Sequence, residues 1–196
     1  MKTTLFKILV VLLFASGIAS AQEKYGKTFN AGVGLSYYGY IGHAVPAIML
    51  NYEIDLVKNV TLAPFIGFYS YRNTYFYNGY YHRNKHGYYY DPYNRYYYRQ
   101  TVVPIGVKGS YYFDDLFNAG DKWDFYAALS LGFAIRTIRY EDSFANDFDN
   151  RYEYGRRSGL YADLHFGTEY HVNQTIGLFA DASIGMLQIG LALHHK

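Results

Sequence analysis

Residues 29–37 read Phe-Asn-Ala-Gly-Val-Gly-Leu-Ser-Tyr, a stretch in which apolar side chains alternate with small or polar ones. Neighbouring side chains of a β-strand point to opposite faces, so this stretch would have one apolar face and one small or polar face. Strands that cross a bilayer need about 9–11 residues, whereas strands of soluble proteins average about 5–6. Alternation of the longer kind recurs over residues 28–40, 45–56, 60–72, 97–113, 123–139, 159–171, 174–184 and 187–194. The pattern predicts an all-β fold, an eight-stranded antiparallel up-and-down transmembrane β-barrel.

The first 21 residues are typical of an export signal. Lys2 and Lys7 form a basic start, residues 8–14 are uniformly apolar, and Ala-Ser-Ala at 19–21 offers a small-residue cleavage site. The apolar core is too short to span a bilayer as a helix. We therefore expect a signal peptide at 1–21 and one barrel domain at 22–196 in the outer membrane of a Gram-negative type of cell.

Composition narrows the class of protein further. Lys2 and Lys7 account for the formal net charge of +2, so the chain after the signal is formally neutral and gives no reason to expect a nucleic-acid partner. The absence of cysteine excludes disulfides and thiolate metal sites. The mean hydropathy of −0.18 suits a barrel, because a barrel strand shows lipid only at every second residue.

The connections between the expected strands alternate in length. Residues 57–59 and 172–173 are tight turns and 114–122 is a modest one, whereas 73–96 and 140–158 are long. Outer-membrane barrels have short periplasmic turns and longer outside loops. We therefore place the short turns and both ends of the chain at the periplasmic side.

The polar face of the stripes should line the barrel interior. An eight-stranded barrel is only just wide enough for side chains to fill it, and the polar face is rich in glycine and alanine. An Arg or Lys on the lipid face costs about 2–4 kcal/mol at mid-depth. The charges with lumen parity are Glu53, Asp55, Lys108, Arg136, Asp163, Glu169 and Asp181.

Inward charges must be paired to be tolerated. Depth along the strands groups Arg136, Asp163 and Asp181 in the outer half, and Glu53, Lys108 and Glu169 in the periplasmic half. His165 falls between the two groups. These six charged residues form the predicted lumen network, and we expect it to plug the barrel rather than leave a channel.

Aromatic residues with lipid parity gather near the periplasmic strand ends, as at a membrane interface. They are Tyr52, Tyr111, Phe113, Trp123, Phe125 and Tyr170. With the signal, the eight stripes, the alternation of short and long loops and the inward charges, residues 28–194 resemble the small eight-stranded outer-membrane barrels of the OmpX and OmpA transmembrane-domain type, often labelled porin-like. Many such barrels end in an aromatic residue, whereas this chain ends in Leu-His-His-Lys. The resemblance implies a monomer in outer-membrane lipid.

The segment 75–98 holds eleven tyrosines together with several cations. Tyrosine offers a large rigid ring and a polar tip, which suits binding surfaces for glycans, anionic polymers or proteins. Alternatively, the neighbouring strands simply continue above the membrane as a hairpin, with a local turn at 91–94. The candidate surface-binding residues are Tyr80, Tyr81, Arg83, Tyr89, Tyr90 and Arg95.

Four arginines have lipid parity at the outer strand ends: Arg72, Arg99, Arg139 and Arg156. The planar guanidinium matches phosphate geometry, so these residues could contact the phosphates of lipopolysaccharide. The alternative is a set of solvated rim charges.

No catalytic, cofactor or metal site is expected. Asp163, His165 and Ser183 are the residue types of a nucleophile triad, but their lumen parity keeps them from lipid substrates. The acidic loop at 140–157 lacks the glycine of a calcium loop, and the spacing of His82 and His86 means little outside a helix. The expected function is structural or adhesin-like binding through the Tyr-rich hairpin. Small-solute transport and, less favoured, lipid A modification are the alternatives.

Overall fold

The computed structural model describes residues 27–37, 43–77, 80–84, 87–91, 94–113, 122–140 and 158–195. These residues form strands and turns, and among them no helix has the length and hydrophobicity that crossing a membrane requires. The expected export signal at 1–21 lies outside the described residues. The strands are β1 (Lys27–Ser36), β2 (Val45–Val57), β3 (Val60–Tyr77), β4 (Tyr80–Asn84), β5 (Gly87–Asp91), β6 (Asn94–Tyr112), β7 (Trp123–Tyr140), β8 (Gly159–His171), β9 (Ile176–Ser183) and β10 (Met186–His195).

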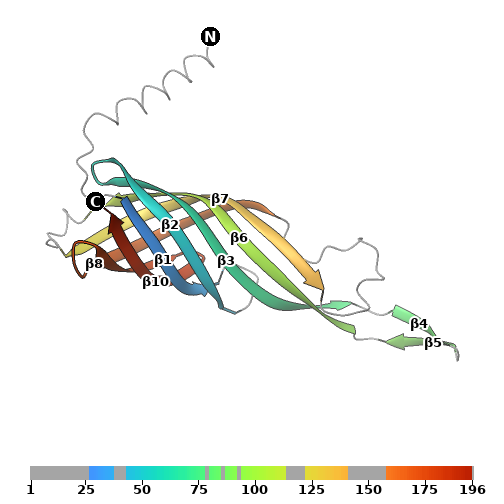
Figure 1. The fold of residues 1–196 in the computed structure, drawn as a ribbon. Coiled ribbons are helices and arrows are strands. Elements are labelled where there is room, and N and C mark those ends of the chain that lie inside the picture. The colour runs from blue at the N-terminus through green and yellow to red at the C-terminus, as the bar shows by residue number, and fades with distance from the viewer. Residues whose placement is uncertain are drawn as a thin grey trace, which may run out of the picture.

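Eight strands close into a barrel in the order β1-β10-β9-β8-β7-β6-β3-β2 (Figure 1). Barrel strands that follow each other in the chain pair antiparallel. β3 pairs with β6, because β4 and β5 lie between them and form a separate two-stranded ladder. β1 pairs with β10 and closes the barrel. The seam is closed by β1, in which Val33 pairs with Ile48 of β2 on one side and with Ile189 of β10 on the other. The predicted up-and-down eight-stranded barrel is confirmed.

The outer surface is a continuous belt of large apolar side chains. Leu131, Phe166 and Ile189 keep 51%, 60% and 63% of their surface exposed, although a soluble protein would bury such residues. The inward positions between them are buried and mostly small or polar, such as Ser130 and Gln188. The apolar stripe therefore faces outward, as predicted, and is suited to contact with hydrocarbon.

Glycines allow side chains and strands to approach closely inside the barrel. Gly106 and Gly132 are direct cross-strand partners, and a Cβ on either one would collide with the backbone of the opposite strand. Gly167 lies under the ring of Tyr126, which occupies the space a Cβ would need. These positions explain why the lumen face of the stripes is so rich in glycine.

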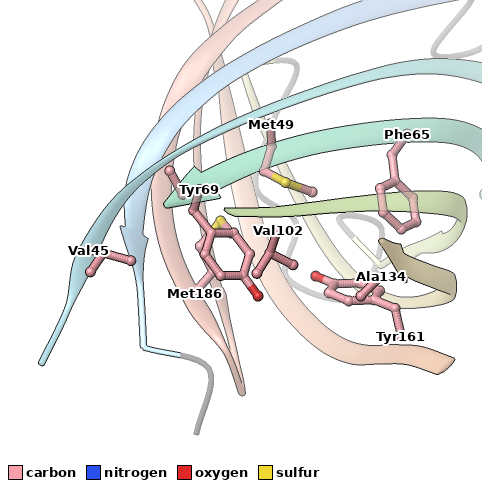
Figure 2. Packing of buried hydrophobic residues seen from close by; sticks show 9 residues of the cluster. Val45, Met49, Phe65, Tyr69, Val102, Ala134, Tyr161 and Met186 are labelled. Carbon is pink, nitrogen blue, oxygen red and sulfur yellow. The ribbon is translucent and has the colours of Figure 1, made fainter. Parts of the chain in front are cut away.

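One half of the lumen contains a buried apolar cluster (Figure 2). Phe65 and Tyr161 come from opposite sides of this cluster, with ring centroids 5.5 Å apart. Side chains this large were not expected on the lumen face, because that face is rich in glycine and alanine. The members are Val45, Ala47, Met49, Phe65, Tyr69, Val102, Ala134, Tyr161 and Met186.

Asparagines shape the two tight turns. Asn59 has a φ of 62°, in the left-handed region that asparagine tolerates better than most residues. Asn173 accepts hydrogen bonds at its Oδ1 from the backbone N–H groups of Thr175 and Ile176. Both turns lie at the barrel end that also holds the C-terminal strand end.

The strands that flank the hairpin run beyond the expected 60–72 and 97–113. β3 runs to Tyr77 and pairs there with Asn94, and β4 and β5 then form a further ladder that closes between Asn84 and Gly87. Asp91 pairs with Tyr80, so the segment 91–94 lies on the return limb. The flanking strands therefore continue as a hairpin, and the expected local turn at 91–94 includes residues 92–93, which lie outside the described residues.

Candidate functional site

The centre of the lumen is organised around the carboxylate of Asp181. Its Oδ2 accepts hydrogen bonds from Lys108 Nζ at 3.0 Å and from the Tyr126 hydroxyl at 2.8 Å. Its Oδ1 lies 2.8 Å from His165 Nδ1. Lys108 also lies 4.5 Å from the centroid of the Tyr126 ring, in a cation–π geometry. A buried ion pair with this many partners is satisfied on both sides.

His165 connects this pair to a second group of polar residues. Its Nε2 lies 2.9 Å from Ser130 Oγ and 3.8 Å from Asp163 Oδ2. Ser183 donates a 2.7 Å hydrogen bond to the same oxygen of Asp163. Asp163, His165 and Ser183 do not form a triad: His165 contacts Asp181 and Ser130, whereas Ser183, although it is the cross-strand partner of His165, bonds to Asp163.

Ser130, His165 and Asp181 have the connectivity of a Ser-His-Asp triad, with the imidazole between hydroxyl and carboxylate. A nucleophile must also be reachable by its substrate. Ser130 and His165 keep only 2% and 3% of their surface exposed. The arrangement is a buried relay of hydrogen bonds.

Glu53 has a separate environment near the end of the lumen with the short turns. It accepts hydrogen bonds from Asn30, Thr61, Ser110 and Tyr112 at 2.9–3.2 Å. All four donors to this carboxylate are neutral. Depth along the strands had suggested a pairing of Glu53 with Lys108, which is not among these contacts.

Glu169 lies at the same end of the barrel, among histidines. Its Oε1 lies 2.6 Å from His194 Nε2 and 3.8 Å from His171 Nδ1. His171 Nε2 lies in turn 2.6 Å from Asp124 Oδ2. These groups, on β7, β8 and β10, are referred to below as the rim cluster: Asp124, Glu169, His171 and His194.

The structure therefore distributes the six predicted lumen charges differently from the two depth groups. Lys108 reaches Asp181, since its long side chain spans the space between the halves. Asp163 joins them through His165, whereas Glu53 and Glu169 each have their own partners. Arg136 points inward and is half-buried, and its backbone N–H donates to Ser158 Oγ at 2.9 Å.

Three of the four predicted phosphate-binding arginines stand side by side. Arg72 pairs across the strands with Arg99, and Arg99 with Arg139, so β3, β6 and β7 each contribute one arginine to a single row. All three are exposed on the outer face, and Arg72 lies over the Tyr97 ring at 5.7 Å. The fourth, Arg156, lies outside the described residues.

The structure describes the hairpin residues by their backbone. Tyr81 pairs with Tyr90 and His82 with Tyr89 in the β4–β5 ladder. Tyr80 and Arg83 lie on β4, and Arg95 lies at the start of β6, opposite Phe76. The ladder therefore brings five of the six candidate surface-binding residues together, and it places Arg95 beyond the ladder.

Sequence reasoning missed Ser130, Tyr126 and the rim cluster as partners of the acids. A usable signal was present for the rim cluster. Glu169 and His171 are two residues apart on one strand, so they share a face, and that face is the lumen face. His194 has the same parity two strands away, which only the barrel register brings alongside.

Comparisons with known proteins find only distant similarity, to solved structures of β-barrels. No protein-family model and no curated protein matches the sequence. Among solved structures, a designed transmembrane β-barrel is 13% identical over 87% of this chain and 97% of its own, with a TM-score of 0.46. Neisserial surface protein A is 12% identical (86% and 96%, TM-score 0.47), and Ail of Yersinia pestis, solved with the heparin analogue sucrose octasulfate, is 10% identical (86% and 99%, TM-score 0.44). On its own topology and apolar belt, this chain is a small eight-stranded β-barrel of the outer-membrane type.

Proposed function

We propose that the chain is an outer-membrane protein that presents its Tyr-rich hairpin as a binding surface outside the cell. The observation that carries the proposal is the continued pairing of β3 and β6 beyond the arginine row. Residues 73–77 pair with 94–98, which extends the ladder by about 17 Å at 3.4 Å per residue. The β4–β5 ladder follows, so the segment is a structured hairpin rather than a plain connection.

The hairpin has the composition of a surface for an anionic ligand. Between residues 80 and 95 there are three Lys or Arg residues and one acid, among many tyrosines. Residues directly opposite each other in an antiparallel ladder share a face, which groups Tyr81 with Tyr90 and Arg83 with Tyr88. Aromatic faces beside cations suit acidic polysaccharides, where rings contact the sugar planes and cations contact the acid groups.

The test is a shortened hairpin that leaves the barrel intact. Tyr77 and Asn94 are ladder partners, so replacing residues 78–93 with Asn-Gly would join them through a two-residue turn of the kind hairpins favour. Both proteins would be reconstituted in liposomes and their binding to immobilised heparin measured at low and physiological salt. We expect the full chain to bind in a salt-sensitive way and the shortened chain to lose most of the binding.

A Lys58→Gln variant, altered in the opposite turn, is the matched control. Equal binding by the full and shortened chains, with both barrels closed on a heat-modifiability gel, would refute a binding role for the hairpin. The filled lumen supports this role over small-solute transport, and the burial of Ser130 supports it over lipid A chemistry.

The arginine row supports a second contact, with the phosphates of lipopolysaccharide. Like charges directly opposite each other on adjacent strands destabilise a sheet, so three neighbouring guanidinium groups favour an anionic partner. Their outward exposure is consistent with a partner in the outer leaflet. This contact would anchor the base of the hairpin.

A further inference from the structure

We infer that the rim cluster binds a divalent transition-metal ion, with Glu169, His171 and His194 as its ligands. One ligand atom from each of these residues lies within 4.8 Å of those of the other two. The ligand atoms of a tetrahedral zinc ion are about 3.4 Å apart, given zinc–ligand bonds of about 2.0–2.2 Å. The observed separations from Glu169 Oε1, 2.6 Å to His194 Nε2 and 3.8 Å to His171 Nδ1, lie on either side of that value.

The two imidazoles are oriented as they are in metal sites. In such sites the ring nitrogen that does not bind the metal is usually held by a carboxylate, carbonyl or other polar group. His171 Nε2 lies 2.6 Å from Asp124 Oδ2, and His194 Nδ1 lies 2.9 Å from Thr28 Oγ1. The remaining nitrogen of each ring is left facing the same oxygen of Glu169. Asp124 and Thr28 are therefore the orienting partners.

The barrel makes specific room for this arrangement. β8 and β10 are separated by β9, and at this level β9 contributes Gly177, which pairs with His171 on one side and Ala192 on the other. A Cβ at position 177 would overlap the Glu169 carboxylate. The glycine thus allows the carboxylate to lie across β9 toward His194, and an alanine there would displace it.

Charge and access also favour a cation. Two carboxylates face two imidazoles, so the cluster is negative when the imidazoles are neutral, the form in which histidine binds metals. The His171 and His194 side chains keep 23% and 12% of their surface exposed, so an ion can enter from the end of the lumen. Imidazole with carboxylate is a donor set that Zn²⁺ takes, with one coordination position left for water.

The experiment uses the full barrel, purified from membranes without a polyhistidine tag and stripped with a chelator. Zn²⁺ binding is measured by calorimetry, and Co²⁺ binding by the visible absorption bands of a low-symmetry site. We expect one ion per chain, with Co²⁺ displaced by Zn²⁺. H171A and H194A should each lower the affinity by more than the about 10–100-fold that orienting partners alone contribute.

Three further variants separate a metal site from general damage. D124N keeps all three ligands and should weaken binding by about 10–100-fold, whereas G177A should weaken it by displacing Glu169. The matched control is H195A, since His195 is exposed and adjacent in sequence but outside the cluster. Heat-modifiability gels confirm that each variant has a closed barrel.

Two results with the variants would overturn the inference. One is Zn²⁺ binding that H171A and H194A, both closed, retain at full strength. The other is binding that H195A abolishes while the cluster variants keep it, which would place the ion on the exposed chain end. Absence of any Co²⁺ or Zn²⁺ binding by the unaltered barrel would refute it outright.

Discussion

Lys108 Nζ lies 3.0 Å from Asp181 Oδ2 in the middle of the lumen, and both side chains are almost completely buried. Lys108 belongs to β6 and Asp181 to β9, which are separated around the wall by β7 and β8. The pair therefore braces opposite sides of the barrel through its interior. Because Tyr126 and His165 share the same carboxylate, its loss would affect four strands at once.

Removing either charge of this brace should destabilise the barrel strongly. Lys108→Met leaves Asp181 as a buried carboxylate without its cation, and breaking a buried pair typically costs about 3–5 kcal/mol. Lys108→Met combined with Asp181→Asn should cost less than the two single changes added together, by about 1 kcal/mol or more. Urea unfolding in lipid vesicles, followed by the single tryptophan Trp123, measures this coupling. Strict additivity would mean that the two charges do not stabilise each other.

Ser130→Ala should affect stability and leave ester hydrolysis unchanged. The change removes the 2.9 Å contact with His165 Nε2, which is worth about 1 kcal/mol for a typical hydrogen bond. Short-chain nitrophenyl esters should be hydrolysed no faster by the natural barrel than by the variant. Hydrolysis that disappears only in the Ser130 variant, with Ser183→Ala still active, would reveal an opening of the lumen that admits substrate.

Most of the barrel could be predicted from period-two alternation, because lipid-facing and lumen-facing positions alternate along every strand of a narrow barrel. The alternation shows which face of a strand a side chain lies on, but not how far that side chain extends across the lumen. It therefore did not predict that Lys108 reaches Asp181. It also missed that Glu53 is held by neutral donors. The rim cluster was not found because His194 reaches Glu169 only through the register of β8, β9 and β10.

Spin labels on the outer face should report acyl chains. Leu35, Leu131 and Leu191 keep 48%, 51% and 48% of their surface exposed and lie on three different strands of the belt. In a reconstituted bilayer, labels there should be relaxed strongly by oxygen and weakly by a water-soluble nickel complex. A label at Lys58, in an exposed turn, serves as the aqueous reference. Nickel accessibility at the three belt positions matching that at Lys58 would contradict the membrane orientation.

Replacing the arginine row should reduce bound lipopolysaccharide. The triple change Arg72→Gln, Arg99→Gln and Arg139→Gln removes three adjacent positive charges and keeps side chains that can still donate hydrogen bonds. We expect most of the lipopolysaccharide that co-purifies in mild detergent to be lost, as measured by its phosphate content. Lys58→Gln with Lys122→Gln, at the opposite end, is the charge control and should keep it. Retention equal to that control would mean that the row consists of ordinary rim charges.

The barrel should not conduct ions in steady steps. Two aromatic and apolar layers fill the lumen, one around Tyr69 and Tyr161 (Figure 2) and the other around Tyr112 and Tyr126, whose ring centroids are 5.5 Å apart. The Lys108–Asp181 brace lies between them, so an ion would have to pass three obstacles in series. Planar-bilayer recordings should therefore show a flat baseline where a large porin shows stable steps.

The two layers in the lumen also predict the conductance of a variant in which one layer is removed. Tyr69→Ala with Tyr161→Ala would empty part of the first layer, but the tyrosines of the second layer and the brace would remain in place. Such a variant should lose about 3–5 kcal/mol of stability for each truncated ring and still carry no steady current. Steady steps in the unaltered barrel would favour the transport alternative. Steps in this variant alone would show that the first layer is the only barrier.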